Sequence, residues 1–403
     1  MEKHQDKLRL ATIILFCLLN IGFGLYAWQM PMLIGGAAGM VYAAVATAGV
    51  LHHSARPAEA PLTLSAPAIA TEQPAAPNDT ESLVRRMLTQ SRHALLLRKQ
   101  VVGNLHEDQF QETCEQLHAH MALVPEGDVV LGKTDKDAED ELGGLPSAMA
   151  ERRMHVNPLF LDRYTVTNRQ YYEFVDAGGY RDMTLWEPKL WAAVLDLVDQ
   201  TGQPGPAFWQ NGRYLPGTED LPVVGVSWYE AQACARWMGK RLPTDAEWVK
   251  AACWPVATGE VAMVQRRFPW GDGLDRSRAN LWGSGPNRIV AVTEFPTSAS
   301  VGGIYQMVGN VWEWSANDFH LSPHQTYGGG DAPLKSIRGG AFDTYFDNQA
   351  TCQFESGEYP LSRRHNIGFR CAIGTCDLVL DLPQGAPEDH ANVELAECEA
   401  VHA

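Results

Sequence analysis

The chain has 403 residues, of which 45% are hydrophobic, and it carries a formal net charge of −16. The apolar fraction, which includes 12 tryptophans, can fill a large core and excludes a chain that is disordered throughout. The shortage of Lys and Arg argues against nucleic acid as a partner, because phosphate binding needs a field of positive charge.

Two apolar runs come first, at residues 10–28 and 32–51, separated by Gln29, Met30 and Pro31. Each run has about the 20 residues that a membrane-spanning helix needs. We therefore predict a transmembrane helical hairpin within residues 1–53, in contact with the lipid bilayer through residues 10–51. The alternative is a cleaved signal peptide, whose apolar region is shorter and is followed by a cleavage site with small residues.

The segments that follow differ in composition. An Ala- and Pro-rich stretch at 54–79 is typical of an extended linker. Apolar residues recur at helical spacing over 80–120, which predicts a helical stalk, and an acidic tail over 377–403 is predicted to be disordered. Between them, residues 121–376 have the frequent turn residues of a loop-rich α+β domain. Three capping boxes predict helix starts in that domain, at Thr167–Gln170, Ser227–Glu230 and Thr244–Glu247.

Several motifs of this domain occur in a characteristic order. They are MALVPEGDVVLG (121–132), DRYTVTNRQYYEFV (162–175), PVVGVSWYEAQACARWMGKRLPTDAEW (222–248), FPWGD (268–272), GNVWEW (309–314), RGGAF (338–342) and NIGFRC (366–371). In this order they resemble the formylglycine-generating enzyme family, also called the sulfatase-modifying factor domain. The resemblance implies the family fold, which is a loop-rich variant of the C-type-lectin-like fold.

The resemblance also implies a chemistry that can be compared with the residues present. Catalytic members of this family oxidise a sulfatase cysteine to formylglycine with O2 and a copper ion held by two thiolates, and thiolate sulfur suits soft Cu(I). The two cysteines follow a double glycine, which is Gly339-Gly340 here, and Thr344 and Gln349 stand nearest to their positions. We therefore expect no copper.

These observations predict a non-catalytic binding, scaffold or maturation subunit of a membrane or envelope protein complex, with another protein as its partner. The alternative is a formylglycine-generating type of oxidase that acts on a protein cysteine through a rearranged centre, built from Cys352 and Cys371.

The resemblance to the secreted branch of the family implies two disulfides, Cys234–Cys371 and Cys253–Cys352. The alternative is four buried thiols in a reducing compartment. Basic residues flank the outer ends of the predicted hairpin, which favours a cytoplasmic domain under the positive-inside rule. We give the cysteines and the linker more weight, and predict a protein of the cell (inner) membrane with its soluble domain outside the cytoplasm.

Calcium is the other metal that the resemblance implies. One family site maps onto a side-chain oxygen, two backbone carbonyls and a carboxylate, which are hard donors that suit Ca²⁺. An alternative is that GNVWEW is only a structural turn. A second site is matched at the start of its pattern, but its aspartate loop is shortened to GSGPN (283–287). The first set is Gln306, Gly309, Val311 and Glu313, and the second is Asn280 and Leu281.

An insertion dense in aromatic residues completes the candidate sites. Its rings could line a ligand groove or a protein contact, or could simply pack the insertion onto the core. The tryptophans considered for a groove are Trp186, Trp191, Trp209 and, from GNVWEW, Trp312.

Overall fold

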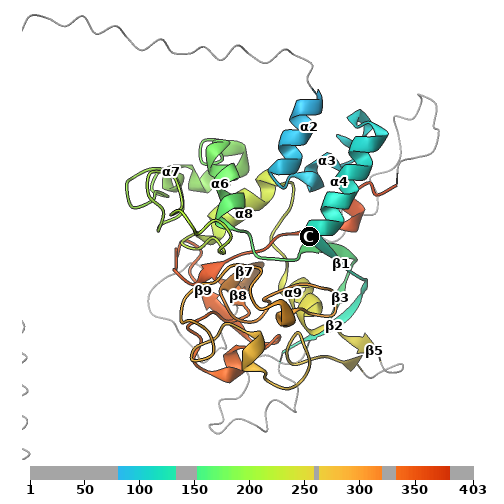
Figure 1. The fold of residues 1–403 in the computed structure, drawn as a ribbon, viewed down its shortest axis with the longest axis vertical. Coiled ribbons are helices and arrows are strands. Elements are labelled where there is room, and N and C mark those ends of the chain that lie inside the picture. The colour runs from blue at the N-terminus through green and yellow to red at the C-terminus, as the bar shows by residue number, and fades with distance from the viewer. Residues whose placement is uncertain (1–79, 133–151, 258–262, 320–332, 382–403) are drawn as a thin grey trace, which may run out of the picture. The chain divides into compact units, whose positions relative to one another are not determined.

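The computed structural model describes residues 80–132, 152–257, 263–319 and 333–381 of the chain (Figure 1). The predicted transmembrane hairpin, the linker and most of the acidic tail lie outside these residues. Within the described residues, no helix combines the length and apolar character that crossing a membrane requires.

The segment predicted as a helical stalk does contain helices, and these pack against the domain. They are α2 (Thr80–Thr89), α3 (His93–Leu96), the 3-10 turn η1 (Val102–Asn104) and α4 (Glu107–His120). Leu97 and Leu117 are fully buried in one cluster with Phe160 and Ile373 of the sheet that follows. Arg92 also donates to Trp237 O at 3.0 Å and lies over the Trp237 ring. The apolar stripe of these helices therefore faces the domain core.

The strands form a mixed set of small sheets. An antiparallel sheet has the order β1-β4-β11, and a second sheet has the order β10-β7-β8-β9, in which β10 runs parallel to β7. Strand β2 pairs with β3, and β5 with β6. Their bounds are β1 (Met121–Val124), β2 (Gly127–Leu131), β3 (Arg152–Val156), β4 (Leu159–Asp162), β5 (Val256–Ala257), β6 (Met263–Val264), β7 (Trp312–Phe319), β8 (Leu334–Arg338), β9 (Glu355–Glu358), β10 (Ile367–Gly368) and β11 (Ala372–Gly374).

The three predicted helix starts are confirmed. Helices α6 (Asn168–Asp176), α8 (Trp228–Trp237) and α9 (Asp245–Cys253) each begin after a Thr or Ser whose hydroxyl accepts from the N–H three residues on. The fourth residue of each box returns a bond to the backbone of the cap, so two otherwise unpaired N–H groups are satisfied. Shorter helical turns are η2 (Met183–Leu185), η3 (Pro188–Leu190), α7 (Trp191–Val194), η4 (Arg276–Arg278), η5 (Pro296–Ser298), η6 (Asp347–Gln349) and η7 (Thr375–Asp377).

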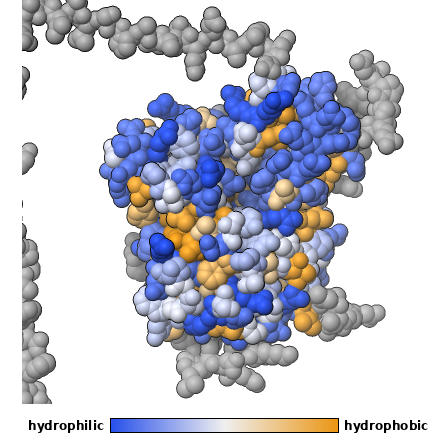
Figure 2. All heavy atoms as spheres, in the orientation of Figure 1, coloured by the Kyte–Doolittle hydropathy of each residue, from blue (hydrophilic) through white to orange (hydrophobic). Residues whose placement is uncertain are grey.

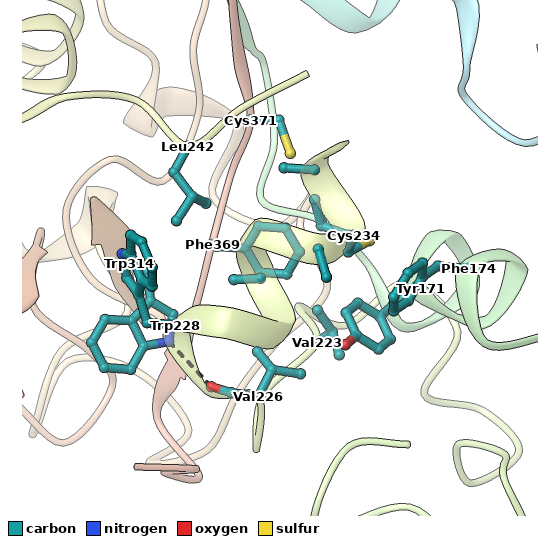
Figure 3. Close-up of a cluster of buried hydrophobic side chains, with 14 of the residues drawn as sticks. Tyr171, Phe174, Val223, Val226, Trp228, Cys234, Leu242, Trp314, Phe369 and Cys371 are labelled. Atoms are coloured by element: carbon teal, nitrogen blue, oxygen red, sulfur yellow. Dashed lines mark hydrogen bonds between the residues drawn. The ribbon is translucent and has the colours of Figure 1, made fainter. Parts of the chain in front are cut away.

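The main core lies between helices α6 and α8 and the sheet that contains β7. Figure 3 shows Tyr171 and Phe174 of α6 on one side of this cluster and Trp314 of β7 on the other. Trp314 is fully buried, and its indole N–H donates to Val226 O at 3.1 Å. Ten of the 26 buried residues of this cluster are aromatic, and burial of such large apolar side chains is the dominant favourable contribution to folding.

Buried ion pairs connect segments that are distant in sequence. Arg338 at the end of β8 pairs with Asp245 at the start of α9 (2.7 Å) and with Glu355 of β9 (3.0 Å). Glu230 of α8, which is fully buried, accepts from Tyr180 at 2.6 Å and from Arg363 at 2.9 Å. Such pairs add directional bonds to a domain with little regular secondary structure.

Candidate functional site

The double glycine after β8 forms the turn on which the candidate site is built. Gly339 and Gly340 have φ angles of +93° and +75°, a region that side chains with a Cβ rarely adopt. A Cβ on Gly339 would lie 2.7 Å from Met307 O, so glycine is required there for space as well. The turn brings the chain against GNVWEW, because Gly309 N–H donates to Gly339 O at 2.9 Å.

Thr344 and Gln349, the two positions expected from the family resemblance to stand in place of the copper cysteines, come together at this turn. A Cβ on Gly340 would lie 3.2 Å from Thr344 Oγ1 and 3.5 Å from the backbone oxygen of Gln349. Thr344 is buried, and its hydroxyl accepts from Ala341 N–H at 2.8 Å. Neither side chain carries sulfur, so the residues present do not fit a two-thiolate copper centre.

The predicted disulfide partners are neighbours, but the bridges are absent from the structure, in which all four cysteines are free thiols. The Cys371 and Cys234 thiols interact electrostatically, as do those of Cys352 and Cys253. Figure 3 shows the first pair, with Cys234 on α8. Burial raises the pKa of Cys253 to about 12 and raises the pKa of the other three well above the ordinary value.

The two cysteines of the predicted rearranged oxidase centre belong to different core clusters. Cys352 belongs to the core cluster around Trp248, whereas Cys371 belongs to the cluster around Trp314. Burial raises the pKa of both thiols well above the ordinary value, and a metal is bound by the thiolate. Within the described residues, no group of three or more His, Cys, Asp or Glu side chains could hold a metal ion.

Three of the four residues in the first calcium set do not fit the ion as they are placed, because their donor oxygens already accept hydrogen bonds. Both carboxylate oxygens of Glu313 accept from Arg370, at 2.6 and 2.7 Å, and one also accepts from Trp248 Nε1 at 2.8 Å. Gln306 Oε1 accepts from the Asn310 side chain at 2.7 Å, and Gly309 O accepts from Val311 N–H at 2.9 Å. Sequence analysis missed Arg370 as the partner because it lies 57 residues further along the chain.

The second calcium set keeps one unused donor. Asn280 is buried, and its side-chain oxygen has no hydrogen-bond partner, although its amide nitrogen donates to Arg288 O and to Asn310. The backbone oxygen of Leu281 already accepts from Ser284 and Gly285 N–H groups. One free amide oxygen is too few for Ca²⁺, which takes six to eight oxygen ligands. Calcium at Asn280 and Leu281 stays a prediction.

The four tryptophans considered for a groove do not form one. Trp186, Trp209 and Trp312 are buried in the main core, and the first two donate to Gly179 O and to the Asn168 side chain. Trp191 of α7 is 50% exposed and stands apart from them. A polar cavity of about 300 Å³ lies beside the insertion instead. Its lining includes Tyr172, Tyr180, Arg181, Asn211 and Arg213.

The surface next to Thr344 carries exposed aromatic side chains that the sequence analysis did not single out. Trp282, Tyr345 and Phe346 are 49%, 65% and 60% exposed. Their rings are neighbours, with centroids 6.5 Å apart for Trp282 and Tyr345 and 5.2 Å apart for Tyr345 and Phe346. Arg276 holds the two loops together by pairing with Asp347 and donating to Trp282 O. We call Trp282, Tyr345 and Phe346 the aromatic face.

Other aromatic side chains of the described residues are exposed as well, including Trp191 (50%) and Phe208 (42%). Figure 2 shows that the drawn side is mainly hydrophilic over helices α2 and α4, with apolar residues gathered nearer its middle. Large aromatic rings that are exposed and clustered mark binding surfaces more often than single exposed rings do.

Comparison with known proteins agrees with the motif order. The model of the sulfatase-modifying factor enzyme 1-like domain matches residues 106–375. Relatives include a hercynine oxygenase of Mycolicibacterium thermoresistibile (32% identical over 59% of this chain and 55% of the relative) and a formylglycine-generating enzyme of Thermomonospora curvata (30%, over 64% and 94%). Another is the inactive C-alpha-formylglycine-generating enzyme 2 of Bos taurus (31%, over 63% and 88%). The chain spans about half the length of the hercynine oxygenases.

Proposed function

Because the chain belongs to the sulfatase-modifying factor enzyme 1-like family, we propose that it uses the family domain to bind another protein and does not carry out copper-dependent oxidation. The observation behind this is that the turn at Gly339-Gly340 presents Thr344 and Gln349, neither of which carries sulfur, beside the exposed aromatic face. Relatives of similar identity have names that denote two different activities and an inactive protein, so membership of the family does not fix the activity.

The aromatic face is the part of this surface that we propose makes contact with the partner. Burying an aromatic side chain at the centre of an interface contributes more to affinity than most other contacts do. Its three rings lie on two loops joined by the Arg276–Asp347 pair, so they are held close together before binding. A partner segment with apolar side chains would fit such a surface.

The test is copurification from native membranes, with the full chain as bait. We expect Trp282→Ser combined with Tyr345→Ser to lower the yield of a specific partner at least tenfold. Trp191→Ser is the matched control, since Trp191 is exposed to nearly the same extent as Trp282 but lies on α7. An unchanged yield with the double variant, or an equal loss with the control, would overturn the proposal.

Enzymatic activity is tested separately. Incubation of the full chain with Cu(I) and a peptide that carries C-x-P-x-R should give no aldehyde by mass spectrometry. The variant Thr344→Cys with Gln349→Cys should gain Cu(I) binding, since both positions lie beside Gly340. Aldehyde formation by the unaltered chain that disappears in Cys352→Ser would establish the alternative, a rearranged oxidase.

Our proposal further places the domain outside the cytoplasm, anchored through residues 10–51, in a complex of the membrane or envelope. The closeness of Cys234 to Cys371 and of Cys253 to Cys352 supports it, because these pairs can then form the two bridges. The measurement is thiol labelling. The chain is isolated from cells under conditions that trap thiols, and it is labelled in the unfolded state. Labelling of all four cysteines without a reductant would contradict the extracytoplasmic location.

A further inference from the structure

A cavity of about 190 Å³ lies between the β1–β2 turn and the C-terminal end of α9, and none of its lining residues belongs to the aromatic face. Figure 1 shows α9 beside β2 and β3. Its walls come from Val124, Pro125, Glu126, Gly127 and Asp128 on one side and from Lys250, Trp254 and Pro255 on the other. The lining thus combines apolar rings with a single cation.

Lys250 is unusual because it is buried without an acidic partner. Only 4% of the residue is exposed, and its ammonium group donates to Gly127 O at 2.7 Å. No carboxylate of the described residues lies within ion-pair distance of it. Burial lowers the pKa of Lys250, and the more distant carboxylates of Asp128 and Glu126 only partly oppose this. Gly127 O is the one acceptor that the described residues provide, although an ammonium group has three N–H donors.

The two acidic side chains of the cavity lining contact residues of strand β3. Asp128 accepts from His155 at 2.9 Å and lies 3.5 Å from Arg153. Glu126 is mostly exposed and lies 3.3 Å from His155. Asp128 is thus paired with Arg153 and Glu126 is open to solvent, whereas Lys250 is the buried charge of the lining.

Trp254 forms the apolar wall in a strained conformation. It ends α9 with φ at +43°, a region that bulky side chains rarely occupy. Gly302 makes room for its ring, since a Cβ there would lie 2.4 Å from Trp254 Cζ3. Strained residues of this kind are concentrated at ligand-binding and catalytic sites, where the surrounding structure holds them in place.

We propose that this cavity binds a small carboxylic acid with an apolar body, whose carboxylate accepts from the Lys250 ammonium while its carbon chain packs on Trp254 and the prolines. A carboxylate supplies the charge that Lys250 lacks, and charge-assisted hydrogen bonds are about twice as strong as neutral ones. The cavity volume limits the ligand to a few carbon atoms beyond the carboxylate. The site is independent of the partner surface proposed above.

The first test compares butyrate with butyramide, which has nearly the same shape but no charge, by calorimetric titration of the full chain. We expect saturable binding of butyrate, at least tenfold weaker binding to Lys250→Met, and none of butyramide. Lys189→Met is the control, because Lys189 is exposed and pairs with Glu187. Equal binding of butyramide, or full binding of butyrate to Lys250→Met, would overturn the assignment.

The second test needs no variant and therefore stands even if Lys250→Met does not fold. Limiting acetic anhydride is added to the unaltered chain, and acetylation of each lysine is followed by mass spectrometry. Butyrate should slow modification of Lys250 at least fivefold and leave Lys189 unaffected, whereas butyramide should change neither rate. Equal rates at Lys250 with and without butyrate would exclude the site.

Discussion

Replacing Arg370 with Met is the substitution whose effect the structure defines best. The Arg370 guanidinium is fully buried, donates twice to Glu313, and also donates to the backbone oxygens of Asp162 and Tyr305. Methionine removes all of these donors and leaves the Glu313 carboxylate with Trp248 Nε1 as its remaining described partner. An uncompensated carboxylate is thus left in the core.

The expected loss follows from the cost of such a charge. Breaking a buried ion pair by removing one partner costs about 3–5 kcal/mol of unfolding free energy. In a domain of this size each kcal/mol lowers the Tm by roughly 2–4 °C, so we expect a drop of roughly 12 °C. Urea unfolding of the full chain, followed by tryptophan fluorescence, should show a lower midpoint with an unchanged slope.

Two further variants separate the charge effect from lost packing. Arg169→Met is the control, because Arg169 pairs with Asp220 at the surface, and it should leave the midpoint unchanged. Adding Glu313→Gln to Arg370→Met should recover a large part of the loss. If the double variant is as unstable as Arg370→Met alone, the stranded carboxylate is not the cause. Calcium should give no Tm shift that Glu313→Gln abolishes, because such a shift would mean that Glu313 binds the ion.

Three other predictions concern local contacts. His93 is buried with neither ring nitrogen paired, and burial together with nearby Lys240 lowers its pKa well below the ordinary value, so it stays neutral when folded but protonates near pH 6.5 when unfolded. The free energy of unfolding should therefore fall as pH drops below about 6.5, and it should fall less in His93→Phe. If the urea midpoint changes by the same amount between pH 7.5 and 5.5 in both proteins, this prediction is wrong. Gly302→Ala should lower the free energy of unfolding by about 1–3 kcal/mol, because its Cβ overpacks against Trp254. Gly273→Ala is the control and should be neutral, since nothing lies within 4 Å of its Cβ. Equal Tm values for the two variants would contradict the prediction. Ser227→Ala removes the cap of α8 and should cost about 1 kcal/mol in chemical unfolding, and an unaltered midpoint would show that the cap is dispensable.

Features encoded by neighbouring residues were predictable from the sequence. The capping boxes at Thr167, Ser227 and Thr244 each need only four residues, and all three helices begin there. The motif order likewise identified the family, because each motif is a short run of residues.

Features that depend on distant contacts were not predictable in the same way. Trp186 and Trp191 are both tryptophans of one insertion, yet one is buried and the other half exposed, because burial depends on what packs against each. Glu313 has the residue type of a calcium ligand, and only the fold shows that Arg370 occupies its carboxylate. The aromatic face combines loops more than 60 residues apart in the chain, at Trp282 and Tyr345, so no local pattern could reveal it.

The sheet β1-β4-β11 also sets the order in which the molecule can form. Its central strand, Leu159–Asp162, pairs on one side with Met121–Val124 and on the other with Ala372–Gly374, more than 200 residues later. Pairing strands that are this distant in sequence loses much chain entropy before the new contacts compensate for it, which slows folding. During synthesis the domain must therefore wait for its final strand, and the preceding chain keeps one edge of β4 open to aggregation until that strand is made.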